Sequence, residues 1–544
     1  MRAGDIALLS QSGALSNYAS AEALARGLRM SHVVTFGNAA DVTPDEVIDY
    51  LAGVPETKVI ACYLEGVGDS VAFRAACQKA IQAGKRVIAL KSGRSEQGRR
   101  AVASHTASMT GSAEAFDALC KSAGVLSVRS IGELLDVAAA SRLLPDQAGK
   151  LGMISFSGAS CALFADYCAA AGLEIATLGD ATKEALTKIL PWFLKPTMPF
   201  DVGQTVFDHA LFTTLLEHIA VDPGIGTLVV NLHTINPSAL RPDLKIEAIK
   251  AVQRQTGKPI VVVWEAARPE DADNLRTLTD CAVFYDMSRA ISALGRLSSA
   301  PLAAPSSQPR DPIARIDGLD DEHAVKTFLG GLGLPVPQGR LITTDEIKSG
   351  ADFNGTGRFV LKIVSPDIQH KTEVGGVLLN VPADAVVEAA NKMLFRIAAT
   401  CPEARLRGIL VEQMAPAGAQ EIVVSLLRDV ECGPVLTIGA GGTAIELYRD
   451  VARRVCPVSV EEIHQMLREL KSFPLLDGFR GAPPADVDAL AGLAENISRI
   501  AVAAPWLTQL ELNPVLVGRA GEGVMIVDAL AELDASTGHQ DVTG

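Results

Sequence analysis

The feature that most constrains this chain is an internal repeat. The segment GDIALLSQSGALSNYASAEALARGL (residues 4–28) aligns without a gap with GKLGMISFSGASCALFADYCAAAGL (residues 149–173). Each copy opens with a short apolar run, passes through a Ser-Gly turn and continues as an amphipathic stretch, which is typical of a strand, a tight turn and a helix. Apolar strands alternate with helical stretches further along both copies. The repeat therefore predicts two doubly wound α/β domains, each with a parallel sheet covered on both faces.

Changes of composition along the chain predict the domain boundaries. The two copies of the repeat correspond to domains at 1–146 and 147–298. A stretch rich in Pro, Ala and Ser, without an apolar period, predicts a linker at 299–319. Strands such as RFVLKIV and GILVEQM, which look antiparallel and lie between helices, predict an α+β domain over 320–535, followed by a tail at 536–544.

Composition narrows the class of protein. Hydrophobic residues make up 48% of the chain and charged residues 21%, values typical of a soluble globular protein. The 49 basic and 63 acidic residues give a net charge of −14, which argues against nucleic acid or an anionic membrane as partner. Nine cysteines without a CxxC pair indicate reduced thiols. With no run near the roughly 20 apolar residues of a membrane span and no signal peptide, a cytoplasmic location is expected.

The most informative segment is LKSGRSEQGRRAVASHTASMTGS, which places Lys91, Arg94, Arg99 and Arg100 just before His105. We expect His105 in a small-residue loop after a strand, at the edge where parallel sheets of this type carry their sites. The corresponding place in the second copy, after VVVWEAARPED, has no histidine. This asymmetry favours a functional histidine over the alternative, a loop histidine bonded to the backbone.

Two turns are candidate phosphate cradles. Ser12 and Gly13 begin a predicted helix directly after the first strand, where free backbone N–H groups attract anions. Gly441, Gly442 and Thr443 end a strand and enter AIELYRDVARR, which we interpret as a second helix start. Each motif alone is also compatible with a plain turn. Together with one histidine, they predict phosphoryl transfer through phosphohistidine.

Several charged residues complete the candidate sites. Glu65, at the end of a strand in the domain of the candidate histidine, could accept a proton from its imidazole, or else simply face solvent. Lys362 lies between apolar neighbours on a predicted strand, which suggests a counterion such as a nucleotide phosphate, unless the strand is an edge strand. Glu511, Asn513 and Asp528 lie on apparently paired strands and offer oxygen ligands for Mg²⁺.

Taken together, these segments resemble the NDP-forming acyl-CoA synthetase superfamily, which includes ADP-forming acetate–CoA ligases and succinyl-CoA synthetases. The motifs SQSGAL, GNAADV, LKSGRS with SHT, VLKIVSPDIQHKTEVGG, GAGGTAIELYRDV and LELNP occur in the family's order over nearly the whole chain. The resemblance implies two tandem flavodoxin-like domains of the succinyl-CoA synthetase type followed by an ATP-grasp domain.

The resemblance also implies roles for individual residues. His105 matches the histidine that is phosphorylated, Glu65 the carboxylate that orients it, and His370 a second histidine that passes phosphate toward the nucleotide. Other matches are phosphate-binding residues Ser12, Gly13, Gly441, Gly442 and Thr443, nucleotide-binding residues Lys362 and Glu412, and Mg²⁺ ligands Asn513 and Asp528. The implied reaction converts a small carboxylic acid, CoA and ATP to acyl-CoA, ADP and phosphate through an acyl phosphate. A homo-oligomer is expected by resemblance.

Two departures from the family pattern qualify the function. Ala107 stands where many relatives have glycine after the Ser-His-Thr motif, and the CoA-binding domain that opens full-length relatives has no counterpart before Gly4. The sequence therefore predicts an acid–CoA ligase that needs a CoA-binding module from a separate chain or from an earlier start. One alternative is a non-catalytic nucleotide-binding or regulatory subunit. Another keeps the chemistry and changes the acid to succinate or an aryl or branched acid.

Overall fold

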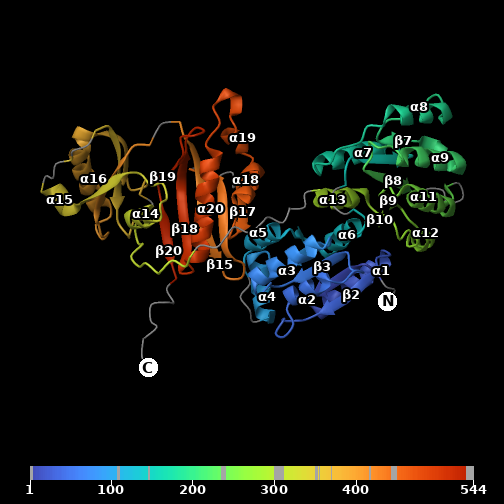
Figure 1. Cartoon of the computed structure of the whole chain (residues 1–544), viewed down its shortest axis with the longest axis horizontal. Coiled ribbons are helices and arrows are strands. Elements are labelled where there is room, and N and C mark those ends of the chain that lie inside the picture. Colours follow the sequence, from blue (N-terminus) through green and yellow to red (C-terminus); the bar gives the residue numbers. More distant parts are fainter. Residues whose placement is uncertain are drawn as a thin grey trace. The chain divides into compact units, whose positions relative to one another are not determined.

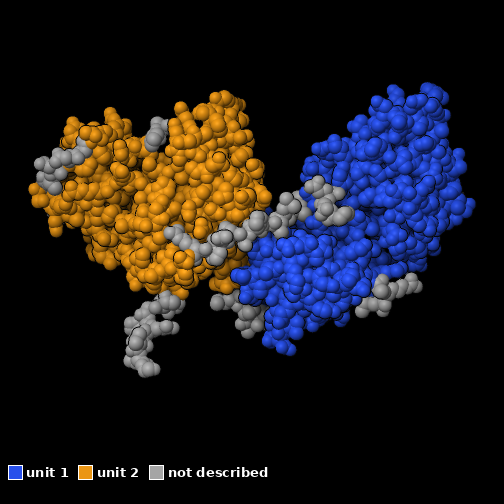
Figure 2. Space-filling model, viewed as in Figure 1, with its two compact units in different colours: residues 1–303 blue, residues 304–544 orange. Residues whose placement is uncertain are grey.

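The computed structural model divides the chain into two compact units, residues 1–303 and 304–544 (Figure 2). The described residues are 4–106, 111–144, 148–233, 240–298, 311–349, 353, 356–368, 371–415, 418–442 and 450–534. Within these ranges, no helix is both long and apolar enough to cross a membrane.

The first domain of unit 1 is built on a parallel five-stranded sheet (Figure 1). The strand order is β2-β1-β3-β4-β5. The first strand, β1, therefore lies inside the sheet, with β2 added on one side of it and β3, β4 and β5 added in turn on the other. The strands are β1 Ile6–Ser10, β2 Met30–Thr35, β3 Val59–Leu64, β4 Arg86–Lys91 and β5 Leu126–Val128. The helices are α1 Gly13–Ala25, α2 Pro44–Ala52, α3 Ser70–Gln82, α4 Glu96–Thr106, α5 Ala113–Ala123 and α6 Ile131–Ser141.

The second domain repeats this plan with a parallel sheet of order β10-β9-β8-β6-β7 (Figure 1). Its strands are β6 Leu151–Ser155, β7 Phe200–Asp201, β8 Thr227–His233, β9 Ile260–Glu265 and β10 Ala282–Phe284. Its helices are α7 Gly158–Ala170, α8 Asp180–Ile189, η1 Gly203–Phe207, α9 His209–Ala220, α11 Pro242–Thr256, α12 Pro269–Leu275 and α13 Met287–Ser298. The two sheets confirm the predicted pair of flavodoxin-like domains.

The two domains of unit 1 share a hydrophobic core. Side chains of α6 such as Leu134, side chains of α13 such as Ile291 and strand residues of both sheets are buried in one cluster. Ion pairs accompany this contact, because Asp136 of α6 binds both Arg26 of α1 and Arg289 of α13. The repeat therefore folds into two sheets held by a common layer of helices.

Unit 2 contains two antiparallel sheets (Figure 1), as expected for an ATP-grasp domain. The first sheet, of order β11-β14-β12-β13, comprises β11 Gly339–Thr343, β12 Arg358–Val364, β13 Val377–Pro382 and β14 Gly408–Gln413. The second, of order β17-β16-β15-β18-β19 with β20 also on β18, comprises β15 Gln420–Asp429, β16 Gly433–Ala440, β17 Val451–Val455, β18 Leu507–Val517, β19 Val524–Ile526 and β20 Leu530–Leu533. The helices are α14 Glu322–Gly331, α15 Thr344–Lys348, η2 Ala383–Ala385, α16 Val386–Thr400, α18 Val460–Glu469, α19 Phe473–Leu476, η3 Phe479–Gly481 and α20 Val487–Ala503.

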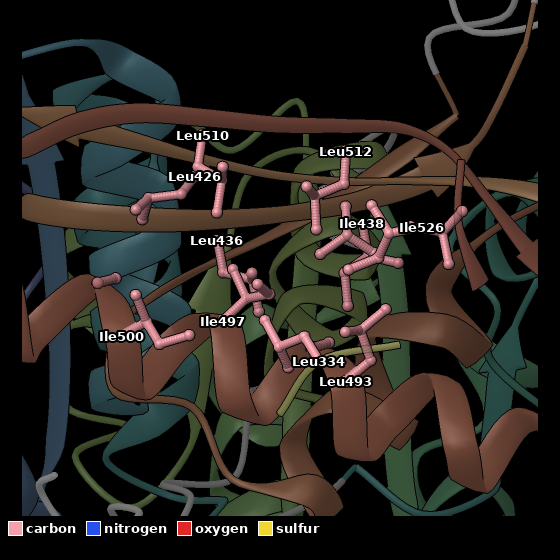
Figure 3. Close-up of a cluster of buried hydrophobic side chains, with 14 of the residues drawn as sticks. Leu334, Leu426, Leu436, Ile438, Leu493, Ile497, Ile500, Leu510, Leu512 and Ile526 are labelled. Atoms are coloured by element: carbon pink, nitrogen blue, oxygen red, sulfur yellow. The ribbon is translucent and has the colours of Figure 1, made fainter. Parts of the chain in front are cut away.

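Alternation along the central strands explains the core of the second sheet. Leu426 of β15, Leu436 of β16 and Leu510 of β18 are fully buried and face Ile497 and Ile500 of α20 (Figure 3). These strands have period-two apolar residues on one side, and α20 has apolar residues at helical spacing. This core holds β16, which leads into Gly441 and Gly442, beside β15, and β15 beside β18, which carries Asn513.

Two local predictions are wrong. His105 lies by its backbone in the last turn of α4 and not in a loop. The segment AIELYRDVARR is predicted to be a helix, but its last residues belong to a strand. Val451–Val455 form β17, which pairs antiparallel with β16. There Ala452 and Arg454 are buried while Val451 and Arg453 are less so, which is the alternation of a strand. The helical reading failed because pairing with the edge of β16 satisfies the backbone of this segment.

Candidate functional site

The first candidate site lies at the carboxyl edge of the first sheet, at the start of α1. Ser12 is the N-cap of α1, and its Oγ accepts from the backbone N–H of Leu15 at 3.4 Å. Gly13 opens the helix, and among the described residues a methyl group at its Cα would meet the Thr35 side chain alone, at 3.9 Å. The helix start is therefore open, and its positive end is available to an anion.

Glu65 is fixed beside this helix start by Gln11. The side-chain oxygen of Gln11 accepts from the backbone N–H groups of Glu65 at 2.5 Å and of Gly66 at 3.1 Å. Burial and the neighbouring Glu65 carboxylate raise the pKa of Tyr63. The structure thus brings Glu65 and the Ser12–Gly13 turn to one edge of the sheet. Gln11 was missed, although its place between the serines of SQSG, where the second copy has Phe156, was a visible signal.

The basic residues before the histidine do not act as one group. Lys91 is buried at the end of β4, and its Nζ donates to the backbone oxygen of Glu65 at 2.9 Å. Arg94 pairs with Asp117, and Arg100 pairs with Glu96 on the exposed face of α4. Lys91 therefore brings a positive charge to the Glu65 edge. The two predicted phosphoryl acceptors lie outside the described part of the chain: this holds for the side chain of His105 and for the whole of His370. The cradle residue Thr443 also lies outside it.

The second candidate site is a buried group of charges in unit 2, which we name the lysine–carboxylate cluster. Lys362 Nζ of β12 lies 2.7 Å from Glu322 Oε1 of α14 and 3.2 Å from Glu412 Oε2 of β14. Lys326 Nζ contacts the same two carboxylates at 2.8 and 2.6 Å. The members of the cluster are Glu322, Lys326, Lys362, Lys371, Glu412 and Asp528.

Mutual pairing favours the charged forms of Lys362 and Glu322 despite their burial. Burial opposes the charge of Lys362, but Glu322 and Glu412 outweigh it and raise the pKa of the lysine. Burial likewise acts against the Glu322 carboxylate, but the three lysines around it hold its pKa far below the usual value. At Lys326 and Asp528 burial prevails, lowering the pKa of the lysine and raising that of the carboxyl group.

The cluster answers the prediction that Lys362 needs a counterion. Its counterions are protein carboxylates, those of Glu322 and Glu412. Asp528 belongs to the same cluster through Lys371, at 3.4 Å. Glu322 and Lys326 were missed by sequence reasoning. Their signal was a pair of opposite charges four residues apart on the apolar face of a helix.

The third candidate site joins the glycine turn after β16 to the end of β18. The backbone N–H of Gly442 donates to Asn513 Oδ1 at 3.2 Å, and that of Gly441 donates to the Glu421 backbone oxygen at 2.9 Å. A methyl group at the Cα of Gly442 would come within 2.2 Å of Glu421 Oε2, and φ there is +64°. The left-handed φ favours glycine at this turn, whereas the exposed Glu421 side chain can move away from an added methyl group.

Asn513 lies on β18, and Asp528 lies in the short segment between β19 and β20, both of which pair with β18. The register pairs Val515 with Ile526 and Glu511 with Leu530, so Asn513 and Asp528 lie in the interval between these two pairs. The Asn513 side chain also lies 3.5 Å from Glu511 Oε1. This donor set consists of carboxylate and amide oxygens, which fits Mg²⁺, a hard cation that takes few protein ligands.

Comparison with known proteins places these sites in a family. Residues 3–141 match the model of a succinyl-CoA ligase-like flavodoxin domain, and residues 314–533 match the model of an ATP-grasp domain. The chain is 32% identical to acetate–CoA ligase (ADP-forming) I of Archaeoglobus fulgidus, over 96% of this chain and 77% of that protein. It belongs to the ADP-forming acid–CoA ligases. As a member of this family it is an enzyme, and its C-terminal unit is an ATP-grasp domain.

Further similarities fall within the same ligase family. The chain is 30% identical to 4-hydroxybutyrate–CoA ligase (ADP-forming) of Nitrosopumilus maritimus, over 97% of this chain and 78% of that protein. A solved structure of a dinucleotide-forming acetyl-coenzyme A synthetase 1 from Ca. Korarchaeum cryptofilum, in complex with coenzyme A and Ca-AMPCP, is 36% identical, with a TM-score of 0.36. That match covers 39% of this chain and 93% of the solved chain.

Proposed function

We propose that this ligase joins a small carboxylic acid to CoA, converts ATP to ADP and phosphate, and carries the phosphoryl group on His105. The observation that supports this most directly is the pairing of an open helix start with Glu65 at the edge of the first sheet. An acyl phosphate formed from the acid and phosphohistidine would connect the two half-reactions. The proposal also assigns His370 the role of passing phosphate toward the nucleotide.

In unit 1, the residues of α1 and β3 prepare the phosphoryl-transfer step. The open N-terminus of α1 at Ser12 and Gly13 would hold the phosphoryl oxygens, because its N–H groups and helix dipole favour negative charge. Glu65, anchored by Gln11, would accept a proton from one nitrogen of the His105 ring and direct the other nitrogen toward phosphorus. The contribution of unit 1 to catalysis is to orient the reacting groups and to stabilise their charge.

In unit 2, the lysine–carboxylate cluster would receive the nucleotide. Lys362 is held protonated by its neighbours and can offer this charge to a phosphate oxygen. Glu412 lies on the neighbouring strand and would contact the nucleotide from there. Gly441, Gly442 and Thr443 would approach the phosphates with their backbone.

Mg²⁺ would be held by Asn513 of β18 and by Asp528, which lies between β19 and β20, two strands that both pair with β18. When bound, the metal ion would neutralise charge on the transferred phosphoryl group. The protein's own part is to fix the two oxygens, since Gly442 holds the Asn513 amide and Lys371 lies beside Asp528.

The experiment that tests the proposal is the intact mass of the purified chain after incubation with Mg²⁺-ATP at neutral pH. We expect one acid-labile phosphoryl gain, absent in His105→Ala. In His370→Ala the gain should form slowly or not at all, while nucleotide binding persists. ATP binding without any phosphoryl gain, even in the presence of a CoA-binding module, would favour the alternative of a non-catalytic nucleotide-binding subunit.

Complete turnover is the second half of the proposal. Because the family resemblance implies a CoA-binding domain, we expect acyl-CoA formation to require such a module, supplied in trans to a homo-oligomer of this chain. A panel of acetate, succinate, branched and aryl acids, each with ATP, CoA and the module, would identify the acid by acyl-CoA formation. Pocket shape decides this selectivity, so the panel must include acids of different size.

A further inference from the structure

A second group of reactive side chains lies at the carboxyl edge of the second parallel sheet. His233 is the last residue of β8 and Glu265 the last of β9, and the strand register pairs them directly. His233 Nδ1 lies 3.2 Å from Glu265 Oε2, and His233 Nε2 lies 3.2 Å from Oγ of Ser160 in the first turn of α7. A serine, a histidine and a carboxylate in this order form the hydrogen-bonded chain that activates a serine hydroxyl.

Two further polar residues hold the Ser160–His233–Glu265 series of side chains in place. Asn231 is fully buried on β8, and its Nδ2 donates to Glu265 Oε2 at 3.1 Å. Its Oδ1 accepts from Ser155 Oγ at 2.8 Å. Because the anchored Glu265 carboxylate accepts from Nδ1 of His233, the neutral imidazole keeps its proton on Nδ1. Its Nε2 is then available to accept the Ser160 proton.

The first domain has different residues at the equivalent positions. Val59 of β3 and Thr227 of β8 have equivalent places beside β1 and β6, so His233 occupies the position of Glu65. By the same alignment, Ser160 stands where the first copy has Leu15. The second copy therefore carries its own set of reactive groups, at the edge where the fold presents functional side chains.

The surroundings of His233 favour an uncharged substrate. The edge of its ring faces Phe156 with centroids 5.2 Å apart, and Phe156 in turn contacts the half-exposed Phe207. The Asp201 carboxylate lies beside Gly158 at the start of α7, 3.1 Å from where a Cβ would be. With Glu265 also nearby, two carboxylates flank this edge, and Phe156 offers an aromatic wall to an apolar acyl group.

We propose that Ser160, His233 and Glu265 form a second catalytic site, which hydrolyses an ester or thioester of a small apolar acid. Ser160 Oγ attacks the carbonyl carbon, and its proton moves to His233 Nε2. The carbon–oxygen or carbon–sulfur bond to the leaving group breaks, and the leaving alcohol or thiol takes the proton from Nε2. Water then attacks the acyl-serine with His233 as base, which releases the acid and restores Ser160. Glu265 is a positioning residue.

The test is covalent labelling of the full chain with a fluorophosphonate, together with hydrolysis of p-nitrophenyl acetate. We expect one label per chain, mapped by peptide mass to Ser160, and its loss in Ser160→Ala. General-base catalysis typically contributes about 10²–10⁴-fold, so His233→Ala should slow both reactions by that order. Glu265→Gln should slow them less, because the amide oxygen can still accept from the ring N–H. Ser16→Ala, a buried serine near the start of the equivalent helix α1, is the matched control and should label normally.

Three results would overturn the proposal: no labelling of the folded wild-type chain, labelling that persists in Ser160→Ala, or labelling indifferent to His233→Ala. Thermal unfolding of each variant shows whether a loss of labelling comes from unfolding. Neither reaction needs ATP or a phosphorylated histidine. A failure here therefore leaves the proposed ligase function untouched, and the reverse also holds.

Discussion

At the residue scale, the cost of burying charge decides most of what the candidate nucleotide site looks like. Lys362 follows Leu361 and precedes Ile363 on β12, so its ammonium group must find carboxylates or lose its charge. It finds Glu322 from a helix and Glu412 from the adjacent strand. The need for a counterion was predictable from the strand pattern. The identity of the counterions was not, because it depends on how α14 packs against the sheet.

Replacing Lys362 by Met leaves the Glu322 and Glu412 carboxylates buried with one ammonium group fewer. Removal of one partner from a buried ion pair typically costs about 3–5 kcal/mol, so the free energy of unfolding of unit 2 should fall by that order. Urea unfolding followed by circular dichroism measures it. The matched control is Lys392→Met, because the Lys392–Glu388 pair is exposed and should contribute under about 1 kcal/mol. Equal losses in the two variants would contradict this account.

The Gly442 turn gives a second prediction. In Gly442→Ala the new methyl group would displace the Glu421 side chain, and the left-handed φ adds strain of about 1–2 kcal/mol. We expect a lower melting temperature and slower phosphorylation by Mg²⁺-ATP, because relief of this strain would shift the backbone N–H that donates to Asn513 Oδ1. Gly492→Ala in α20 is the control, because no atom lies within 4 Å of the added carbon. There, alanine should leave the melting temperature unchanged or raise it.

At the element scale, helix packing in the second domain of unit 1 buries a lysine that belongs to none of the sites described above. Lys245 of α11 is fully buried, and its Nζ lies 4.4 Å from the centre of the Phe212 ring of α9. Within the described residues its Nζ has no hydrogen-bond partner. Burial lowers the pKa of Lys245 to about 8, opposed only by the more distant Asp208. The α9–α11 contact therefore carries an electrostatic penalty at neutral pH.

The sign of the resulting pH dependence follows from proton binding. Between pH 8 and the ordinary lysine pKa, near about 10.4, the unfolded chain binds a proton at this site that the folded chain does not. The contribution of Lys245 to stability therefore rises with pH across this window. Lys245→Met should abolish that rise and increase the melting temperature at pH 7 by on the order of 2–4 °C. Melting curves at pH 7 and pH 9.5 check both, and a lower melting temperature of the variant at pH 7 would contradict the prediction.

At the scale of the whole molecule, the two units have separate cores and should respond separately to substitution. Asp136 joins the two domains of unit 1 through Arg26 and Arg289, whereas Lys362 belongs to unit 2. We expect calorimetry to resolve two transitions. Asp136→Asn should lower only one of them, and Lys362→Met only the other, because distant and independent sites act additively. The control Asp49→Asn breaks an exposed pair with Lys79 and should move neither. A shift of both transitions by one internal substitution would show coupling between the units.

What the sequence determined by itself is the local and periodic part of the protein. The repeat of residues 4–28 in 149–173, the apolar strands and the order of motifs were enough for two parallel sheets, an ATP-grasp domain and the ligase family. The placement of Glu65 at the end of a strand and of Ser12 at a strand-to-helix turn also followed from the apolar runs that precede them. The domain boundaries and the roles of the site residues stay predictions.

Only the tertiary structure decided which side chains meet across long stretches of chain. Lys362 and Glu322 are 40 residues apart in the sequence, and Lys326 and Glu412 are 86 residues apart. Ser160 and His233 are separated by 73 residues. No local pattern encodes such contacts, because they depend on how whole helices and strands pack, and packing is set by the summed burial of many side chains. For the same reason VARRV formed a strand: the open edge of β16 outweighed the helical preference of the segment.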